Sequence, residues 1–247
     1  MKTKLWKEFG CQMLISGGIY SALFLILYII ESCAPAIKGT LLQWDDPAFI
    51  VGIPASVIGV GYVLTIRNPQ NYTGFYGGIM MSLLLSWQFA LLQQWGLTVL
   101  YVAVFVPFMI YSIICWRKQA LQSQENEQTF CPTWLSLKAQ GLNLLFLIGI
   151  VAIDSGLLTH FETTIHSEQL LLKLMSGVMI GSSVLANFWL IYQKLDAWVW
   201  WVVYSIAGMT MYALIGNAFS FVLFTIFLIV NTGAGIAWIK LRKQHIK

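Results

Sequence analysis

Eight long apolar stretches divide the sequence, and they constrain the fold more than any other feature. A helix needs about 20 mostly apolar residues to cross a bilayer. The stretches that reach or approach this length are 11–32, 47–66, 74–93, 97–116, 135–158, 169–192, 197–215 and 218–238. Only 10% of the 247 residues are charged, against about 25% in soluble proteins. The sequence therefore predicts an all-α integral membrane protein of about eight transmembrane helices, and excludes a soluble enzyme or a nucleic-acid-binding protein.

Residues between the stretches predict where helices begin and turn. Asp46 before Pro47 is typical of a helix start, with the carboxylate capping the first turn and proline occupying its first position. Gly96 and the Gly216-Asn217 pair are turn residues. We therefore expect tight hairpins between stretches 74–93 and 97–116, and between 197–215 and 218–238.

The basic residues predict the orientation of the chain in the membrane. Cytoplasmic loops are rich in Lys and Arg. With eight spans and a cytoplasmic N-terminus, only Lys38 and Lys173 lie outside. The basic residues that lie inside are Lys2, Lys4, Lys7, Arg67, Arg117, Lys118, Lys138, Lys194, Lys240, Arg242, Lys243 and Lys247. Both termini are therefore expected in the cytoplasm, in a multi-pass protein of the cell inner membrane.

The first apolar stretch has two interpretations. It follows a basic start and precedes Ala34-Pro35-Ala36, which resembles the cleavage site of a signal peptide. Its apolar run, however, exceeds the usual 7–15 residues of a signal peptide, and Glu31 and Pro35 crowd the site. We prefer a retained helix.

A shift of 122 positions superimposes the second to fourth stretches on the last three. Phe105 then falls on Phe227, and Trp116 falls on Trp238. Because one span separates the two three-helix units, both have the same orientation, as in a parallel repeat. We therefore expect an N-terminal helix followed by a 3+1+3 bundle. The predicted divisions are 1–46 for the N-terminal helix and outer loop, 47–118 for the first unit, 119–168 for the linker and connecting helix, and 169–247 for the second unit and basic tail.

Polar side chains within apolar stretches are the first candidates for a binding site, because unpaired polar groups are costly in a bilayer. These candidates are Gln88, Gln140, Asn143, Asn187, Ser205 and Asn231. An amide provides two donors and an acceptor, which suit a ribose hydroxyl or a carboxamide. Hydrogen bonding between helices is the alternative interpretation for each of them.

Aromatic side chains form the second group of candidates. Trp198, Trp201 and Ser205 lie at i, i+3 and i+7, along one stripe of a helix. With Trp87 and Tyr204 they are suited to hold a flat ring, and a cationic ring would gain from the aromatic faces. The alternative is an aromatic belt at the membrane interface, which applies most directly to Trp198.

The sequence contains no motif of an enzyme active site that we recognise. The four cysteines are scattered without a CxxC pair, and His160 and His166 have no partners at metal-ligand spacing. We expect no enzyme activity, no cofactor and no metal. Two other classes stay open: a membrane enzyme acting on a lipid, for which only Asp45, Asp46 and Asp154 are available, and a structural or assembly protein.

The pattern from Trp198 to Trp238 resembles that of the PnuC-type vitamin transporters, whose characteristic stretch is W-x-x-W-x-x-x-N/D. Trp198 and Trp201 match its tryptophans, and Ser205 stands where Asn or Asp is expected. Gln94 matches a glutamine at the turn after the third stretch. The resemblance covers most of 48–243 and implies a SWEET-like bundle.

The resemblance also implies a function. It points to facilitated diffusion of nicotinamide riboside into the cell, with trapping by a cytoplasmic kinase that phosphorylates it. It implies a homo-oligomer, with a trimer as the first candidate. Because Ser205 replaces the expected amide or acid, other vitamins or nucleosides (thiamine, riboflavin or a deoxynucleoside) stay open as substrates. The substrate-binding residues predicted from residue chemistry and resemblance together are Trp87, Gln88, Gln94, Asn143, Asn187, Trp198, Trp201, Tyr204, Ser205 and Asn231.

Overall fold

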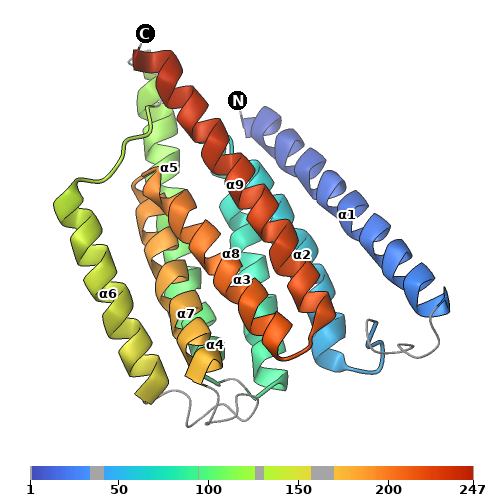
Figure 1. Ribbon diagram of the computed structural model, residues 1–247. Coiled ribbons are helices and arrows are strands. Elements are labelled where there is room, and N and C mark those ends of the chain that lie inside the picture. The colour runs from blue at the N-terminus through green and yellow to red at the C-terminus, as the bar shows by residue number, and fades with distance from the viewer. Residues whose placement is uncertain (1, 34–41, 94, 126–130, 157–169, 247) are drawn as a thin grey trace.

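The protein is an all-helical bundle in a computed structural model that describes residues 2–33, 42–93, 95–125, 131–156 and 170–246 (Figure 1). In the order of the chain, its helices are α1 (Lys2–Cys33), α2 (Pro47–Ile66), α3 (Gly74–Leu91), α4 (Trp95–Leu100), η2 (Tyr101–Phe105), α5 (Val106–Glu125), α6 (Leu137–Gly156), α7 (Leu170–Ile191), α8 (Asp196–Leu214) and α9 (Ala218–Ile246). Since α4, η2 and α5 form one continuous span, the described residues contain eight helices long and apolar enough to cross a membrane. The predicted fold class is confirmed.

Helix ends follow the predicted signals in two places and depart from them in one. Asp46 caps α2, its Oδ1 accepting a hydrogen bond of 2.9 Å from the backbone N–H of Ala48. Gly216 forms the turn between α8 and α9, with φ +73°. The prediction that Gly96 forms a turn is wrong, because α4 already begins at Trp95. The chain reverses earlier, where Gln93 takes a left-handed conformation with φ 59°.

The helices form two groups of three that meet along one seam. In one group α3 packs against α2 and α5, and in the other α8 packs against α7 and α9. The main contacts between the groups are those of α2 with α9 and of α5, together with η2 on the same span, with α7. Each contact pairs the first helix of one group with the last helix of the other, as expected for two units related by a pseudo-twofold axis. Figure 1 shows both termini at the same end of the bundle.

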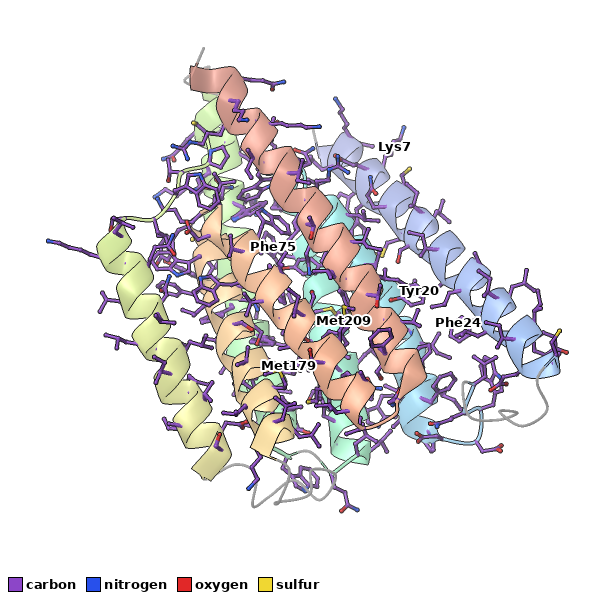
Figure 2. All side chains as sticks on the ribbon, in the orientation of Figure 1. Lys7, Tyr20, Phe24, Phe75, Met179 and Met209 are labelled. Atoms are coloured by element: carbon purple, nitrogen blue, oxygen red, sulfur yellow. The ribbon has the colours of Figure 1, made fainter. Side chains whose placement is uncertain are left out.

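Helices α1 and α6 flank the two groups in equivalent ways. Helix α1 packs against α2, where the Ser16 hydroxyl donates to the carbonyl of Val57. Helix α6 packs against α7, where Trp189 Nε1 donates to Asn143 Oδ1 at 3.0 Å. Many of their other side chains project outward (Figure 2), and the large exposed ones include Leu14, Leu25, Leu142 and Leu145. The cleavage motif proposed at 34–36 lies outside the described residues.

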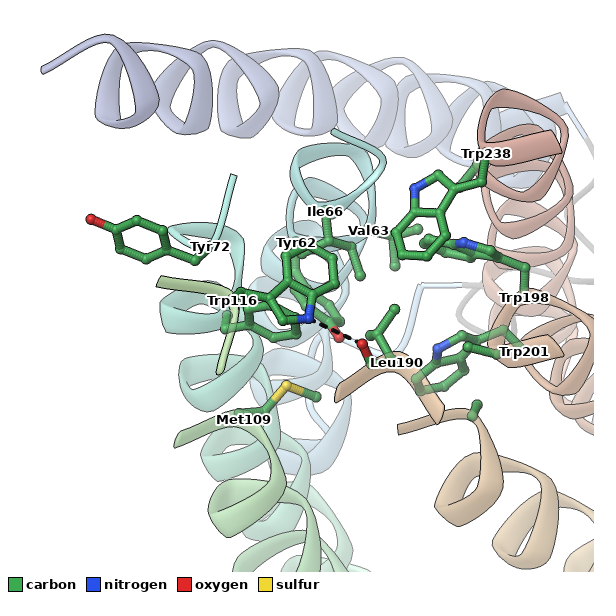
Figure 3. Close-up of a cluster of buried hydrophobic side chains, with 14 of the residues drawn as sticks. Tyr62, Val63, Ile66, Tyr72, Met109, Trp116, Leu190, Trp198, Trp201 and Trp238 are labelled. Carbon is green, nitrogen blue, oxygen red and sulfur yellow. Dashed lines mark hydrogen bonds between the residues drawn. The ribbon is translucent and has the colours of Figure 1, made fainter. Parts of the chain in front are cut away.

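The largest buried cluster lies at the end of the bundle that carries the termini (Figure 3). Its central side chains are fully buried tryptophans on the last helix of each group, Trp116 on α5 and Trp238 on α9. Trp116 Nε1 donates to the carbonyl of Leu190, and Trp238 Nε1 donates to that of Arg67, each at 3.0 Å. These bonds cross the seam and hold both groups together at this end.

Candidate functional site

A narrow cavity of about 30 Å³ lies on the seam between the two groups, and we call it the central cavity. Helices α2, α3, η2 and α5 contribute one side, and α7, α8 and α9 contribute the other. The lining residues are Tyr62, Val63, Met81, Leu85, Tyr101, Phe105, Met109, Asn187, Trp201, Tyr204, Phe227 and Asn231. Side chains fill most of the space between the groups here, so a ligand of nucleoside size requires the lining to move apart.

The two groups line the central cavity with different chemistry. The first group contributes two thioethers, Met81 and Met109, besides apolar and tyrosine side chains. The second group contributes both amides, Asn187 and Asn231, and the indole of Trp201. Among the described residues that line the cavity, none carries a charged side chain, so the cavity suits a ligand recognised by ring stacking and neutral hydrogen bonds.

Two polar atoms in this lining have no hydrogen-bond partner in the structure: the Tyr62 hydroxyl and Asn231 Oδ1. Both residues are only 1% exposed. The other end of the Asn231 amide is fixed, because its Nδ2 donates to Ser205 Oγ at 3.2 Å, and that hydroxyl donates to the carbonyl of Trp201 at 2.8 Å. Buried polar groups normally have partners, so this pair is available to a ligand.

Four of the predicted site residues line the central cavity: Asn187, Trp201, Tyr204 and Asn231. Ser205 stands behind this lining, where it holds the Asn231 amide. Trp198 lies further toward the termini, with its ring 5.4 Å from that of Trp238 (Figure 3). The predicted stripe of two tryptophans is therefore divided. Trp201 lines the central cavity, and Trp198 packs against Trp238 in the largest buried cluster.

The remaining predicted residues lie elsewhere. Trp87 is 58% exposed on the outside of α3. Asn143 accepts the hydrogen bond from Trp189 between α6 and α7. Gln88 lines a second cavity, described below. Gln94 lies outside the described residues.

Sequence reasoning missed several lining residues, among them Tyr62, Tyr101, Met81 and Met109. Nothing in their local sequence distinguishes them from lipid-facing neighbours. The internal repeat offered one sequence signal for lining residues. Phe105 and Phe227 are superimposed by the shift of 122 positions, and both line the central cavity.

A second cavity, of about 90 Å³, lies at the end of the bundle opposite the termini, and we call it the distal cavity. Asp46, Asn217 and Ser220 near the helix ends contribute to its lining, together with Gln88 and Ser56. Four side chains line both cavities: Leu85, Tyr101, Tyr204 and Phe227. Within the described residues, no three His, Cys, Asp or Glu side chains gather closely enough to hold a metal ion.

Comparisons with known proteins agree with this architecture. Residues 50–240 match the profile of a family described as nicotinamide mononucleotide transporter. Over 98% of both chains, the fold is similar to a solved structure titled "Crystal structure of the Vitamin B3 transporter PnuC", with a TM-score of 0.66 and 17% sequence identity. None of the curated proteins matches the sequence. Because the family profile covers most of the chain, this protein belongs to the nicotinamide mononucleotide transporter family.

Proposed function

We propose that the protein carries nicotinamide riboside across the membrane through the central cavity. The family is described by a nicotinamide nucleotide, and the similar structure is titled as a vitamin B3 transporter. Both descriptions share the nicotinamide group. The cavity lining supports a nucleoside of this base in three respects: ring stacking, hydroxyl recognition and charge.

The observation that carries this proposal is the pair of unpartnered polar atoms, the Tyr62 hydroxyl and Asn231 Oδ1, within a cavity lined mostly by aromatic and aliphatic side chains. A sugar hydroxyl can donate to the amide oxygen and accept from the phenol. The Trp201 ring, also in the lining, offers a face for a pyridinium. Such a cation–π contact is worth roughly 0.5–2 kcal/mol.

The lining favours the nucleoside over its phosphorylated form. In the part of the chain that the structure describes, neither the central nor the distal cavity has a Lys or Arg among its lining residues. A phosphate group carries a charge of about −1.5 to −2 at neutral pH, and burying charge without a partner is expensive. We therefore assign the nucleoside as substrate, and expect phosphorylation inside the cell to trap it.

A passive mechanism fits the same lining. Transport coupled to protons or cations commonly uses carboxylates near the substrate site, and the lining of the central cavity contains none. We infer facilitated diffusion in the inner membrane, with both termini in the cytoplasm, by a carrier without enzymatic activity. By resemblance to its family, we further propose a homo-oligomer, with a trimer as the first candidate. The proposal also keeps the predicted division of the chain into an N-terminal helix, two three-helix units and a connecting segment, with boundaries after residues 46, 118 and 168.

Uptake into proteoliposomes tests the function. Labelled nicotinamide riboside should equilibrate without an ion gradient, and uptake should be unaffected by a protonophore. Adding a nucleoside kinase and ATP to the lumen should convert equilibration into accumulation. Accumulation without kinase that collapses with the protonophore would contradict passive transport.

Substrate identity requires a separate comparison. Thermal-shift titrations in detergent with nicotinamide riboside, its mononucleotide, thiamine, riboflavin and a deoxynucleoside should give the largest stabilisation with nicotinamide riboside. Stronger stabilisation by the mononucleotide would refute the charge argument. Stronger stabilisation by another vitamin would retain the carrier and replace the substrate.

A further inference from the structure

The central and distal cavities are adjacent, and a single layer of side chains separates them. This layer consists of Leu85, Tyr101, Tyr204 and Phe227, which line both cavities. A ligand moving between the distal end of the bundle and the central cavity has to pass this layer. Whatever holds the layer closed therefore controls entry from that end.

One direct bond links the two helix groups within this layer. The hydroxyls of Tyr101 on η2 and Tyr204 on α8 lie 3.1 Å apart and form a hydrogen bond. Tyr101 is 5% exposed, and its ring also packs against Phe105 at 4.7 Å. The bond joins the two bodies that have to separate if the distal side opens.

The backbone at Tyr101 is irregular in a way that suits movement. Tyr101 begins η2, a π-helical stretch, where the N–H of Val106 donates to the Tyr101 carbonyl. Pro107 follows directly and has no N–H to continue the regular helical pattern. Short π-helical segments occur often at functional sites. Tyr101 thus lies on a segment whose backbone hydrogen bonding already departs from that of an α-helix.

More buried side chains and hydrogen bonds close the opposite side of the central cavity, at the end of the bundle that carries the termini. Trp116, Trp238 and Leu190 are all fully buried there, and two indole hydrogen bonds cross the seam. Opening that side requires several aromatic side chains to separate. Opening the layer between the two cavities requires the Tyr101–Tyr204 hydrogen bond to break and four side chains to move. Beyond this layer, Phe49 of α2 also packs against Phe219 of α9, with ring centroids 4.8 Å apart.

We propose that the Tyr101–Tyr204 hydrogen bond is the latch of a thin gate between the distal end and the central cavity. This inference rests on the proposed transport function and adds the residues that regulate access to its site. The latch is reversible because a hydrogen bond between neutral groups contributes modestly to stability. Breaking it lets the rings rotate apart without exposing a charged group.

The accessibility of a thiol placed in the central cavity tests the latch without any substrate. Met109→Cys introduces the thiol, since Met109 lines the central but not the distal cavity. The background is a chain with Cys11, Cys33, Cys115 and Cys131 replaced by alanine. A small membrane-impermeant methanethiosulfonate cation is then applied from each side of oriented vesicles, and the rate of modification is measured.

Removing either hydroxyl should open the gate more often. We expect Tyr101→Phe and Tyr204→Phe each to raise the rate from the distal side by roughly three- to tenfold, as loss of one hydrogen bond predicts. The double variant should match the single variants, because either change removes the same bond. Tyr111→Phe is the matched control, since Tyr111 is on the same span and 49% exposed.

Three results would overturn the latch: an unchanged rate, an equal increase with Tyr111→Phe, or additive effects of the two substitutions. Because the assay contains no nucleoside, failure of the latch is distinct from failure of the proposed substrate. If the thiol assay gives the expected rates but the unsubstituted protein does not take up nicotinamide riboside, the proposed function is wrong and the latch is supported.

Discussion

Trp116 and Trp238 close one end of the bundle by reciprocal hydrogen bonds. Each indole N–H donates across the seam, Trp116 to the carbonyl of Leu190 and Trp238 to that of Arg67, at 3.0 Å in both cases. Their rings also lie against each other, with centroids 5.9 Å apart. Two residues that the sequence shift superimposes thus make equivalent bonds in the opposite groups.

Loss of either indole donor should destabilise the protein. Trp116→Phe removes one of two donors to the Leu190 carbonyl, which also accepts from the Gln193 N–H, and Trp238→Phe removes the indole donor from the partly buried Arg67 carbonyl. Loss of each hydrogen bond should cost about 0.5–1.5 kcal/mol. We expect a lower melting temperature in detergent for each variant. Trp87→Phe is the control, since Trp87 is 58% exposed, and it should melt close to the unsubstituted protein. Equal losses for all three variants would show that the hydrogen bonds contribute nothing specific.

Truncation of the Trp201 ring should weaken substrate binding. Trp201→Ala removes the aromatic face from the central cavity, and we expect an affinity loss of about 1–2 kcal/mol for nicotinamide riboside. Isothermal titration in detergent measures this directly. Trp87→Ala is the matched control, and unchanged affinity for Trp201→Ala would remove Trp201 from the site.

The Tyr62 hydroxyl should have opposite effects on the empty and the occupied protein. It is buried and has no partner in the structure, so Tyr62→Phe should stabilise the ligand-free protein by about 1 kcal/mol. The same change should weaken nicotinamide riboside binding by roughly three- to tenfold, through loss of one hydrogen bond.

Paired melting and titration experiments check both signs for Tyr62→Phe. Tyr72→Phe is the control, because Figure 3 shows its hydroxyl directed away from the other labelled aromatic side chains. We expect that variant to bind normally. Stabilisation of Tyr62→Phe without any loss of binding would mean that the hydroxyl does not contact the substrate.

The contact between α6 and α7 depends on a glycine. A Cβ at Gly177 would lie 2.8 Å from the backbone Cα of Val151, so Gly177→Ala has to push the helices apart. We expect a loss of about 1–3 kcal/mol, measured as a lower melting temperature. Gly149→Ala on α6 meets nothing within 4 Å and should be neutral or stabilising. A harmless Gly177→Ala would show that α6 is held loosely.

Sequence patterns predicted the helices well because span length and capping are local properties. Stretch 47–66 coincides with α2, whose start follows from the Asp46-Pro47 signal. Gly96 failed as a turn because Gln93, which has no special local preference, takes the left-handed conformation instead. The helices α1 and α9 also extend beyond their apolar stretches, into the basic segments at both ends.

The site residues were predicted less completely. Polarity within an apolar stretch identified Asn187 and Asn231, which line the central cavity, but the same criterion selected Asn143, which bonds to Trp189 between two helices. Tyr62 carried no signal, since its importance depends on which way α2 faces.

The amino-acid order thus specified eight spans, their expected sidedness and their internal repetition, because hydrophobicity and charge act residue by residue. The rotation of each helix about its axis was fixed only by packing across the seam. That packing directed Trp201 into the cavity and Trp198 into the aromatic cluster, and it brought Tyr101 to Tyr204 over more than 100 positions. Such pairings depend on long-range side-chain contacts, which no local pattern encodes.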